Sequence, residues 1–148
     1  MLILDSGGVT RLSARSKPAL ALIRSLVDEG LWPPIVPTMV LVESLQGDPP
    51  RDANANHLLK TCIIQAEVTP VIARRAAELS RRARTGSAVD ALVVALAEPG
   101  GTVLTGDNAD IEALAAHAQQ VSVEISKINR KGSPFSGSRL ALCPLLRR

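Results

Sequence analysis

The stretch Ser87-Ala-Val-Asp-Ala-Leu-Val-Val-Ala-Leu-Ala-Glu-Pro-Gly-Gly-Thr-Val-Leu-Thr105 decides the fold class of this chain. Ser87 is a favourable cap for a helix, and Pro99-Gly100-Gly101 ends that helix. The helix is apolar nearly all round, which is typical of a buried helix. The short apolar run at residues 102–105 then predicts a buried strand. A buried helix that leads into a buried strand favours an α/β fold.

The rest of the chain repeats this alternation of short apolar strands and helices. Further strands are predicted at residues 2–4, 35–36, 63–68 and 121–125. Further helices are predicted at residues 18–29, 38–45, 52–60, 69–84 and 108–117, and residues 5–8 are predicted to form a turn. The pattern predicts a three-layer α/β/α sandwich, in which helices cover both faces of a central, mostly parallel sheet of about five strands.

The positive charge of the chain is concentrated at its C-terminus. The chain has 148 residues, which suits one domain, with 17 Lys and Arg against 14 Asp and Glu. Six of the 17 basic residues and none of the 14 acidic ones lie in 127–148, which leaves 11 against 14, a net charge of −3, in 1–126. We therefore divide the chain into a domain over residues 1–126 and a basic Gly/Ser/Pro-containing tail over 127–148. The tail is an RNA-contacting arm, a segment ordered by a partner, or a disordered or non-native extension.

Composition and motifs disfavour several functional classes. The only aromatic residues are Trp32 and Phe135, so a platform that stacks single-stranded bases is disfavoured. His57 and His117 have no Cys or His at ligand spacing, so zinc is not supported. The GxxxxGK[ST] and GxGxxG loops that bind nucleotides are absent. Without a signal peptide or an apolar run of about 18 residues, we expect a soluble, cytoplasmic protein.

Five acidic residues are predicted at or near the carboxyl ends of the strands, where open α/β sheets bind ligands. They are Asp5, Glu43, Asp90, Asp107 and Asp110. Each also has a structural alternative, because an acid near the start of a helix can cap it or interact with its positive end. Ser87 and Asp90, for example, loosely match a capping box.

Two of these acids lie in apolar helices and favour a bound cation. Glu43 follows Met39-Val-Leu-Val, and Asp90 precedes Ala-Leu-Val-Val-Ala-Leu. An ionised carboxylate in such surroundings costs several kcal/mol unless a positive group meets it, and no Lys or Arg lies between Arg84 and Lys127. Clustered acids favour Mg²⁺, with Mn²⁺ as a substitute, over zinc. Such a cluster is typical of sites that hydrolyse phosphodiester bonds.

Four segments also carry a resemblance to a known family. They are Leu2-Ile-Leu-Asp5-Ser, Val42-Glu43, Ser87-Ala-Val-Asp90-Ala-Leu-Val-Val-Ala-Leu-Ala97 and Val103-Leu-Thr-Gly-Asp107-Asn-Ala-Asp110. Together they resemble the motifs of PIN-domain ribonucleases over about residues 1–126. The closest type is the VapC-like toxin of VapBC-type (virulence-associated) type II toxin–antitoxin pairs.

The resemblance implies roles for individual residues. The catalytic acidic quartet that holds the metal is matched by Asp5, Glu43, Asp90 and Asp107. Asp110 matches a second acid near the metal, Ser6 a small hydroxyl residue that hydrogen-bonds the cluster, and Thr105 is expected to position Asp107. The chain departs from the family pattern at Gly7-Gly8, which predicts a looser turn after Asp5, and in its tail, which has no counterpart.

The resemblance also implies an activity and partners. The activity is Mg²⁺-dependent endonucleolytic cleavage of RNA (tRNA, rRNA or mRNA) by a metal-activated water. The implied partners are a second copy of the chain and a cognate VapB-like antitoxin, whose C-terminal segment covers the site in a heterotetramer or a larger complex. No membrane is implied.

Four arginines on the helix at 69–84 are candidates for RNA contacts. They are Arg74, Arg75, Arg81 and Arg82. They can contact RNA phosphates, or they can form a solvated helix face in which Glu78 pairs with Arg74 or Arg82. Runs of charge favour the second interpretation.

Two other functional classes remain open. A PIN-like module that binds RNA without cutting it is one, although the complete acid set argues against it. A phosphorylatable receiver domain is the other, and it also places acids at strand ends. It requires paired acids after the first strand, where this chain has Asp5 alone.

Overall fold

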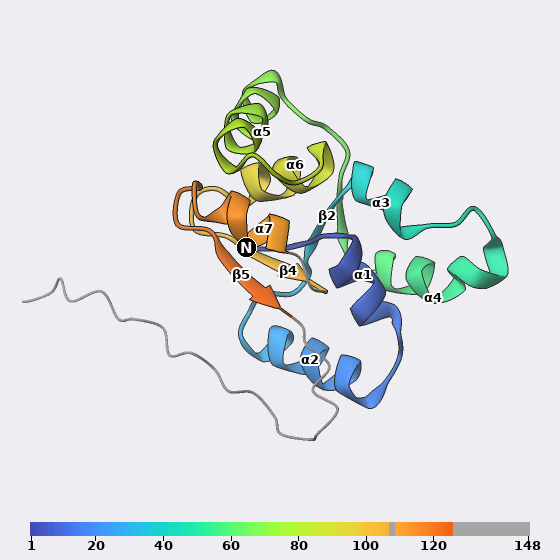
Figure 1. The fold of residues 1–148 in the computed structure, drawn as a ribbon. Helices are drawn as coiled ribbons and strands as arrows, with labels where there is room; N and C mark the ends of the chain where they lie inside the picture. The colour runs from blue at the N-terminus through green and yellow to red at the C-terminus, as the bar shows by residue number, and fades with distance from the viewer. Residues whose placement is uncertain (107–108, 126–148) are drawn as a thin grey trace, which may run out of the picture.

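A computed structural model describes residues 1–106 and 109–125 of the chain (Figure 1). In chain order the elements are β1 (Leu2–Leu4), α1 (Ser6–Ser13), α2 (Lys17–Asp28), β2 (Ile35–Pro37), α3 (Thr38–Ser44), α4 (Pro49–Leu59), β3 (Ile63–Gln65), α5 (Pro70–Ala83), α6 (Ala88–Ala97), β4 (Thr102–Thr105), α7 (Ala109–Ala115) and β5 (Ser122–Ile125). The predicted strands and helices are confirmed to within one or two residues at their ends, with three larger differences. α1 lies where a turn is predicted, α4 begins at Pro49 rather than at Asp52, and β3 ends at Gln65 rather than at Val68. The predicted tail at 127–148 lies outside the described residues.

The strands form one parallel sheet in the order β3-β2-β1-β4-β5. β1 is the central strand, because Ile3 is paired with Ile35 of β2 and with Val103 of β4. The strands are parallel, so their carboxyl ends share one edge of the sheet. The chain moves outward from β1 through β2 to β3 and then crosses to β4, so the strand order switches between β1 and β4. Open α/β sheets bind ligands at such a switch point.

The helices form two packed groups, one on each face of the sheet (Figure 1). α1 contacts α2, α3 and α4, whereas α5, α6 and α7 contact one another. Both α1 and α6 pack on β1 and β4, so the central strand is covered from both sides. Leu2, Ile3 and Leu4 are accordingly at most 1% exposed. This arrangement confirms the predicted α/β/α sandwich. No helix among the described residues has the length and apolar character needed to cross a membrane.

α1 replaces the turn that the sequence predicts after β1. Two glycines disfavour a helix by propensity, but the packing requires them. A Cβ on Gly7 would lie 2.6 Å from the backbone nitrogen of Gly106, and one on Gly8 would overlap the carbonyl oxygen of Leu104. The glycines therefore allow the start of α1 to pack directly against the end of β4. The predicted looser turn after Asp5 is wrong, because Asp5 caps this helix.

Candidate metal centre

Asp5 lies at the middle of the edge where the strands end. It follows β1 directly, and its Oδ1 accepts a hydrogen bond of 2.5 Å from the backbone N–H of Gly8. Burial raises the pKa of its carboxyl most strongly, since the residue is only 4% exposed. The Thr105 hydroxyl and the N–H groups of Gly8 and Gly7 lower this pKa, and the charge of Asp90 raises it. None of these groups is a cation, so within residues 1–106 and 109–125 no positive side chain compensates the Asp5 charge.

Thr105 is the last residue of β4 and is 1% exposed. Its hydroxyl lies near enough to Asp5 to lower the pKa of that carboxyl. Thr105 Oγ1 nevertheless has no partner in hydrogen-bond geometry among the described residues. A buried hydroxyl left in this state costs about 1–3 kcal/mol, which favours a further ligand at this position. The sequence predicts that Thr105 positions Asp107, which lies outside the described residues; the structure places Thr105 beside Asp5.

Asp90 lies in the first turn of α6 and forms the capping box that the sequence suggests. The Ser87 backbone N–H donates to Asp90 Oδ2 at 2.9 Å, and the Asp90 backbone N–H donates to Ser87 Oγ at 3.0 Å. The structural interpretation of Asp90 is therefore confirmed. The same carboxylate also raises the pKa of Asp5 by its charge. Capping thus fixes Asp90 at a place where it interacts electrostatically with a second, buried acid.

Asp110 lies in the first turn of α7 and is half-buried. Its Oδ1 accepts a hydrogen bond of 2.5 Å from Thr85 Oγ1. Thr85 belongs to the loop between α5 and α6, which also holds Ser87. Sequence reasoning missed Thr85, because the two partners are 25 residues apart and no local spacing connects them.

The described residues bring together only part of the predicted acid cluster. Glu43 is exposed on α3, where its neighbour Val42 is 81% exposed, so this apolar helix does not bury it as expected. Ser6 is the first residue of α1 and is half-buried. Within residues 1–106 and 109–125, no three His, Cys, Asp or Glu residues are arranged to hold a metal. Asp107, a member of the predicted quartet, lies outside these residues.

The part that is assembled fits a hard divalent cation. Its donors are carboxylate and hydroxyl oxygens, which Mg²⁺ and Mn²⁺ prefer. Among the described residues, Asp5 has no positive partner for its buried charge, and the Thr105 hydroxyl has no partner in hydrogen-bond geometry. The glycine pair keeps the space around the carboxylate clear, because a Cβ on either Gly7 or Gly8 would lie 3.3 Å from Asp5 Oδ1.

The arginines on α5 divide into two kinds. Arg75 holds Glu98 through two hydrogen bonds of 2.8 and 2.7 Å and Glu78 through one of 2.7 Å. Arg82 pairs with Glu78 at 2.5 Å. These pairs support the structural interpretation for both arginines. Glu78 pairs with Arg82, one of the two partners that the sequence suggests, and also with Arg75, which the sequence does not suggest. The other two candidates for RNA contacts, Arg74 and Arg81, are exposed.

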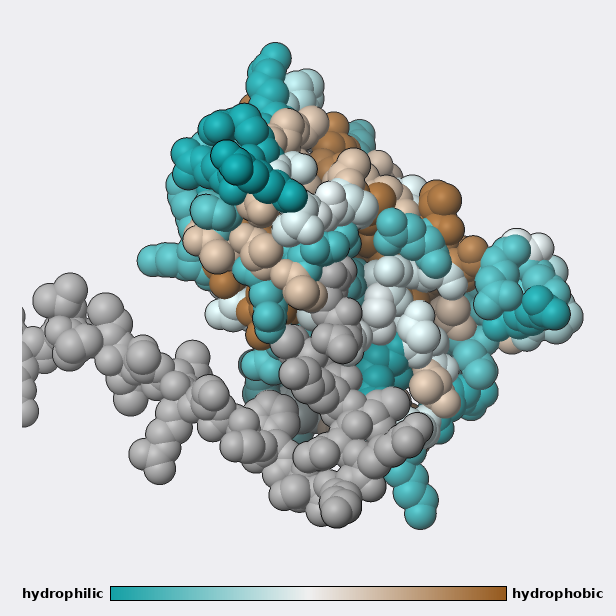
Figure 2. Space-filling model, in the orientation of Figure 1, coloured by the Kyte–Doolittle hydropathy of each residue, from teal (hydrophilic) through white to brown (hydrophobic). Residues whose placement is uncertain are grey.

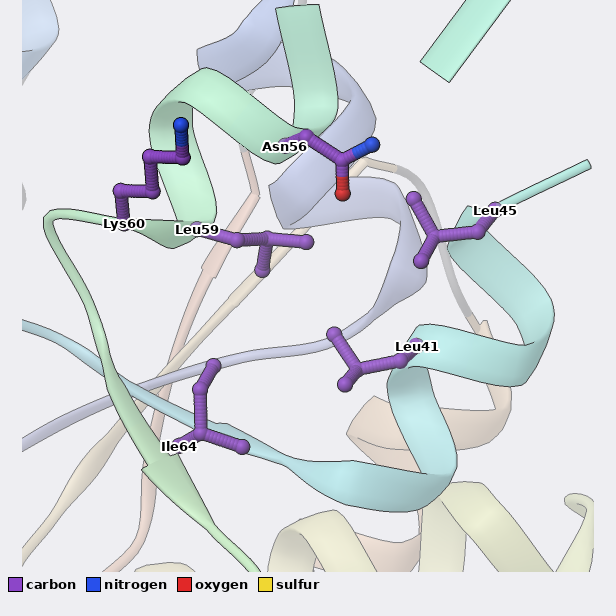
Figure 3. Close-up of a pocket in the computed structure, with 6 residues that line it drawn as sticks. All are labelled: Leu41, Leu45, Asn56, Leu59, Lys60 and Ile64. Atoms are coloured by element: carbon purple, nitrogen blue, oxygen red, sulfur yellow. The ribbon is translucent and has the colours of Figure 1, made fainter. Parts of the chain in front are cut away.

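One cavity lies away from the acids. It has a volume of about 480 Å³ and opens between α3, α4 and β3 (Figure 3). Its lining is mostly apolar and comprises Leu41, Leu45, Asn56, Leu59, Lys60 and Ile64. A second hollow of about 300 Å³ lies between α1, the end of α3 and α4. Neither is lined by Asp5, Asp90 or Asp110, so these two hollows are separate from the candidate metal centre.

Comparison with protein-family models gives no match, and comparison with curated protein sequences gives no similar protein. The functional argument therefore depends on the geometry of the sheet edge.

Proposed function

We propose that this protein is a Mg²⁺-dependent endoribonuclease of the PIN type, acting as the toxin of a type II toxin–antitoxin pair in the cytoplasm. The observation that carries the proposal is Asp5. It is a buried carboxylate at the switch point between β1 and β4, with Asp90 within electrostatic reach and with no cation beside it in the part of the chain that the structure describes.

Each residue has a separate proposed role in phosphodiester hydrolysis. Asp5, fixed by the Gly8 N–H, and Asp90, fixed by Ser87, hold carboxylate oxygens at one edge of the sheet. The Thr105 hydroxyl adds a neutral donor that can orient a water or a phosphate oxygen. When bound, Mg²⁺ supplies an activated water and neutralises the charge of the acids. Glu43, Asp107 and Asp110 complete the proposed acid set.

The proposed partners are a second copy of the chain and a VapB-like antitoxin. Exposed apolar side chains support an interaction surface where α3, β3 and α5 meet. Val42, Ile64 and Val71 are 81%, 40% and 73% exposed. Figure 2 shows hydrophobic surface on the side of the molecule where α3 and α5 lie. Large exposed apolar patches commonly mark protein interfaces.

The direct test is cleavage of RNA by the purified chain, with the 5′ ends of the products mapped. We expect cleavage with Mg²⁺ or Mn²⁺ and none in excess EDTA. Asp5→Asn should reduce the rate more than about 100-fold, since even residues that only support metal ligands cost 10–100-fold. Asn also caps helices well, so this variant should remain folded.

Asp28→Asn is the matched control, because Asp28 is exposed at the end of α2 and should leave the rate unchanged. Equal cleavage by Asp5→Asn, or cleavage that persists in EDTA, would refute the proposal. Mg²⁺-dependent RNA binding without cleavage would instead favour a PIN-like module that only binds RNA.

A further inference from the structure

The loop between α5 and α6 connects two acids of the candidate metal centre. Thr85 donates its hydroxyl hydrogen to Asp110 Oδ1 over 2.5 Å. Two residues later, Ser87 forms the capping box with Asp90. One short segment therefore holds a carboxylate of α7 at one end and a carboxylate of α6 at the other.

The packing around Gly86 keeps this loop in place. Gly86 has a φ of +87°, a backbone conformation that favours glycine. A Cβ there would lie 2.7 Å from Leu114 Cδ1 of α7 and 3.7 Å from Asp90 Cβ of α6. Helices α5, α6 and α7 also contact one another directly. Thr85 therefore lies in a loop whose next residue, Gly86, packs closely against α7 and α6.

We propose that Thr85 is a positioning residue of the metal centre, which fixes the Asp110 carboxylate through its hydroxyl so that this carboxylate can interact with the bound cation. This inference rests on the proposed function, since it assigns Asp110 to the same site. A hydroxyl that donates to one carboxylate oxygen restricts rotation of the carboxylate. Partners of this kind behind metal ligands typically contribute 10–100-fold to metal affinity or activity.

A purely structural role for the same hydrogen bond makes different predictions. Asp110 could stabilise the start of α7 by its charge alone, and Thr85 could tie α7 to the loop. Removal of the hydroxyl would then lower the free energy of unfolding and leave the affinity of the folded protein for a cation unchanged. Cation affinity therefore separates the two roles.

The test uses Mn²⁺ alone as a probe, with its dissociation constant measured by titration calorimetry on the full chain. The variants are Thr85→Val, Thr85→Ser, Asp110→Asn and the double variant Thr85→Val/Asp110→Asn. The matched control is Thr61→Val, because Thr61 also donates through Oγ1, over 2.7 Å to the Leu58 carbonyl, away from the acids. Thermal unfolding in EDTA establishes that each variant is folded.

We expect Thr85→Val to weaken Mn²⁺ binding about tenfold or more. Thr85→Ser should restore most of the affinity, and Thr61→Val should leave it unchanged. The double variant should bind as Asp110→Asn does, because Thr85 acts only through Asp110.

Two results would overturn the inference while leaving the proposed function intact. One is a folded Thr85→Val that binds Mn²⁺ and cuts RNA as the wild-type chain does. The other is a double variant in which the two losses add. If the wild-type chain binds Mn²⁺ in the expected pattern but does not cut RNA, the ribonuclease proposal fails and the role of Thr85 stands. If the wild-type chain binds no Mn²⁺, both fail.

Discussion

The carboxylate of Asp5 and the guanidinium of Arg75 are both largely buried, but only one of them is compensated within the described chain. Arg75 binds Glu98 and Glu78 and also donates to the carbonyl oxygen of His117 at 3.2 Å. Its ion partners raise its pKa and lower those of both glutamates. Asp5 has two backbone donors and a hydroxyl nearby, and its strongest charged neighbour is another acid.

This difference separates a charge that has ion partners in the fold from one that has none among the described residues. Arg75 joins α5 to the end of α6 and to the segment after α7, so its charge is used in holding the fold together. The charge of Asp5 makes the fold less stable unless a cation is bound. The following substitutions test the contribution of the Arg75 cluster or of Asp5 to stability, and the substitution with the largest expected effect comes first.

Arg75→Met should destabilise the fold by about 1–3 kcal/mol. The change leaves Glu98, whose side chain is 10% exposed, without its main partner. The effect stays below that of a fully buried pair because the Arg75 side chain is itself 22% exposed. Urea unfolding measures the change, with the exposed neighbour Arg74→Met as the control, expected within about 0.5 kcal/mol of wild type. Equal stability of the two variants would mean that the Arg75 cluster is not structural.

Asp5→Asn should stabilise the metal-free protein at neutral pH. The folded-state pKa of Asp5 is raised above its usual value of 3.8. Below pH 3.8 the carboxyl is protonated in both the folded and the unfolded protein, so its ionisation does not change the free energy of unfolding. As the pH rises through the folded-state pKa, the buried charge forms and stability is lost. The stability gap between variant and wild type should therefore open above pH 3.8 and persist at pH 7.

Unfolding in urea with EDTA, over a series of pH values, measures this gap. Asp28→Asn should show no comparable trend, since Asp28 is exposed. Saturating Mg²⁺ should narrow the gap by stabilising the wild type alone. A less stable Asp5→Asn at pH 7 in EDTA would show that Asp5 contributes to the fold as Arg75 does.

Arg82→Gln should have the smallest effect. Its ion pair with Glu78 lies between side chains that are 46% and 37% exposed, and solvent screens such pairs. We expect no measurable change in urea unfolding. A clear loss of stability would mean that Arg82, on the outer face of α5, also belongs to the structural cluster around Arg75.

Local sequence patterns predicted most of the fold because caps, breakers and apolar runs act over a few residues. Ser87 and Pro99-Gly100-Gly101 bound α6 as expected. α1 was missed because Gly7 and Gly8 are poor helix formers, and only their contact with β4 explains them. Local patterns also placed Asp5 after the first strand and Asp90 in the first turn of α6. The Thr85 hydrogen bond and the exposure of Glu43 depend on tertiary packing, which local patterns do not describe.

The central position of β1 also determines when during synthesis the candidate metal centre can form. Leu4, next to Asp5, pairs with Leu104, so the first strand made must wait for almost the whole domain before it gains its second neighbour. A nascent chain that has exposed only β1 to β3 lacks α6 and β4, and with them Asp90 and Thr105. Contacts so distant along the chain form late. The proposed metal centre therefore stays incomplete until synthesis of residues 1–125 is nearly finished.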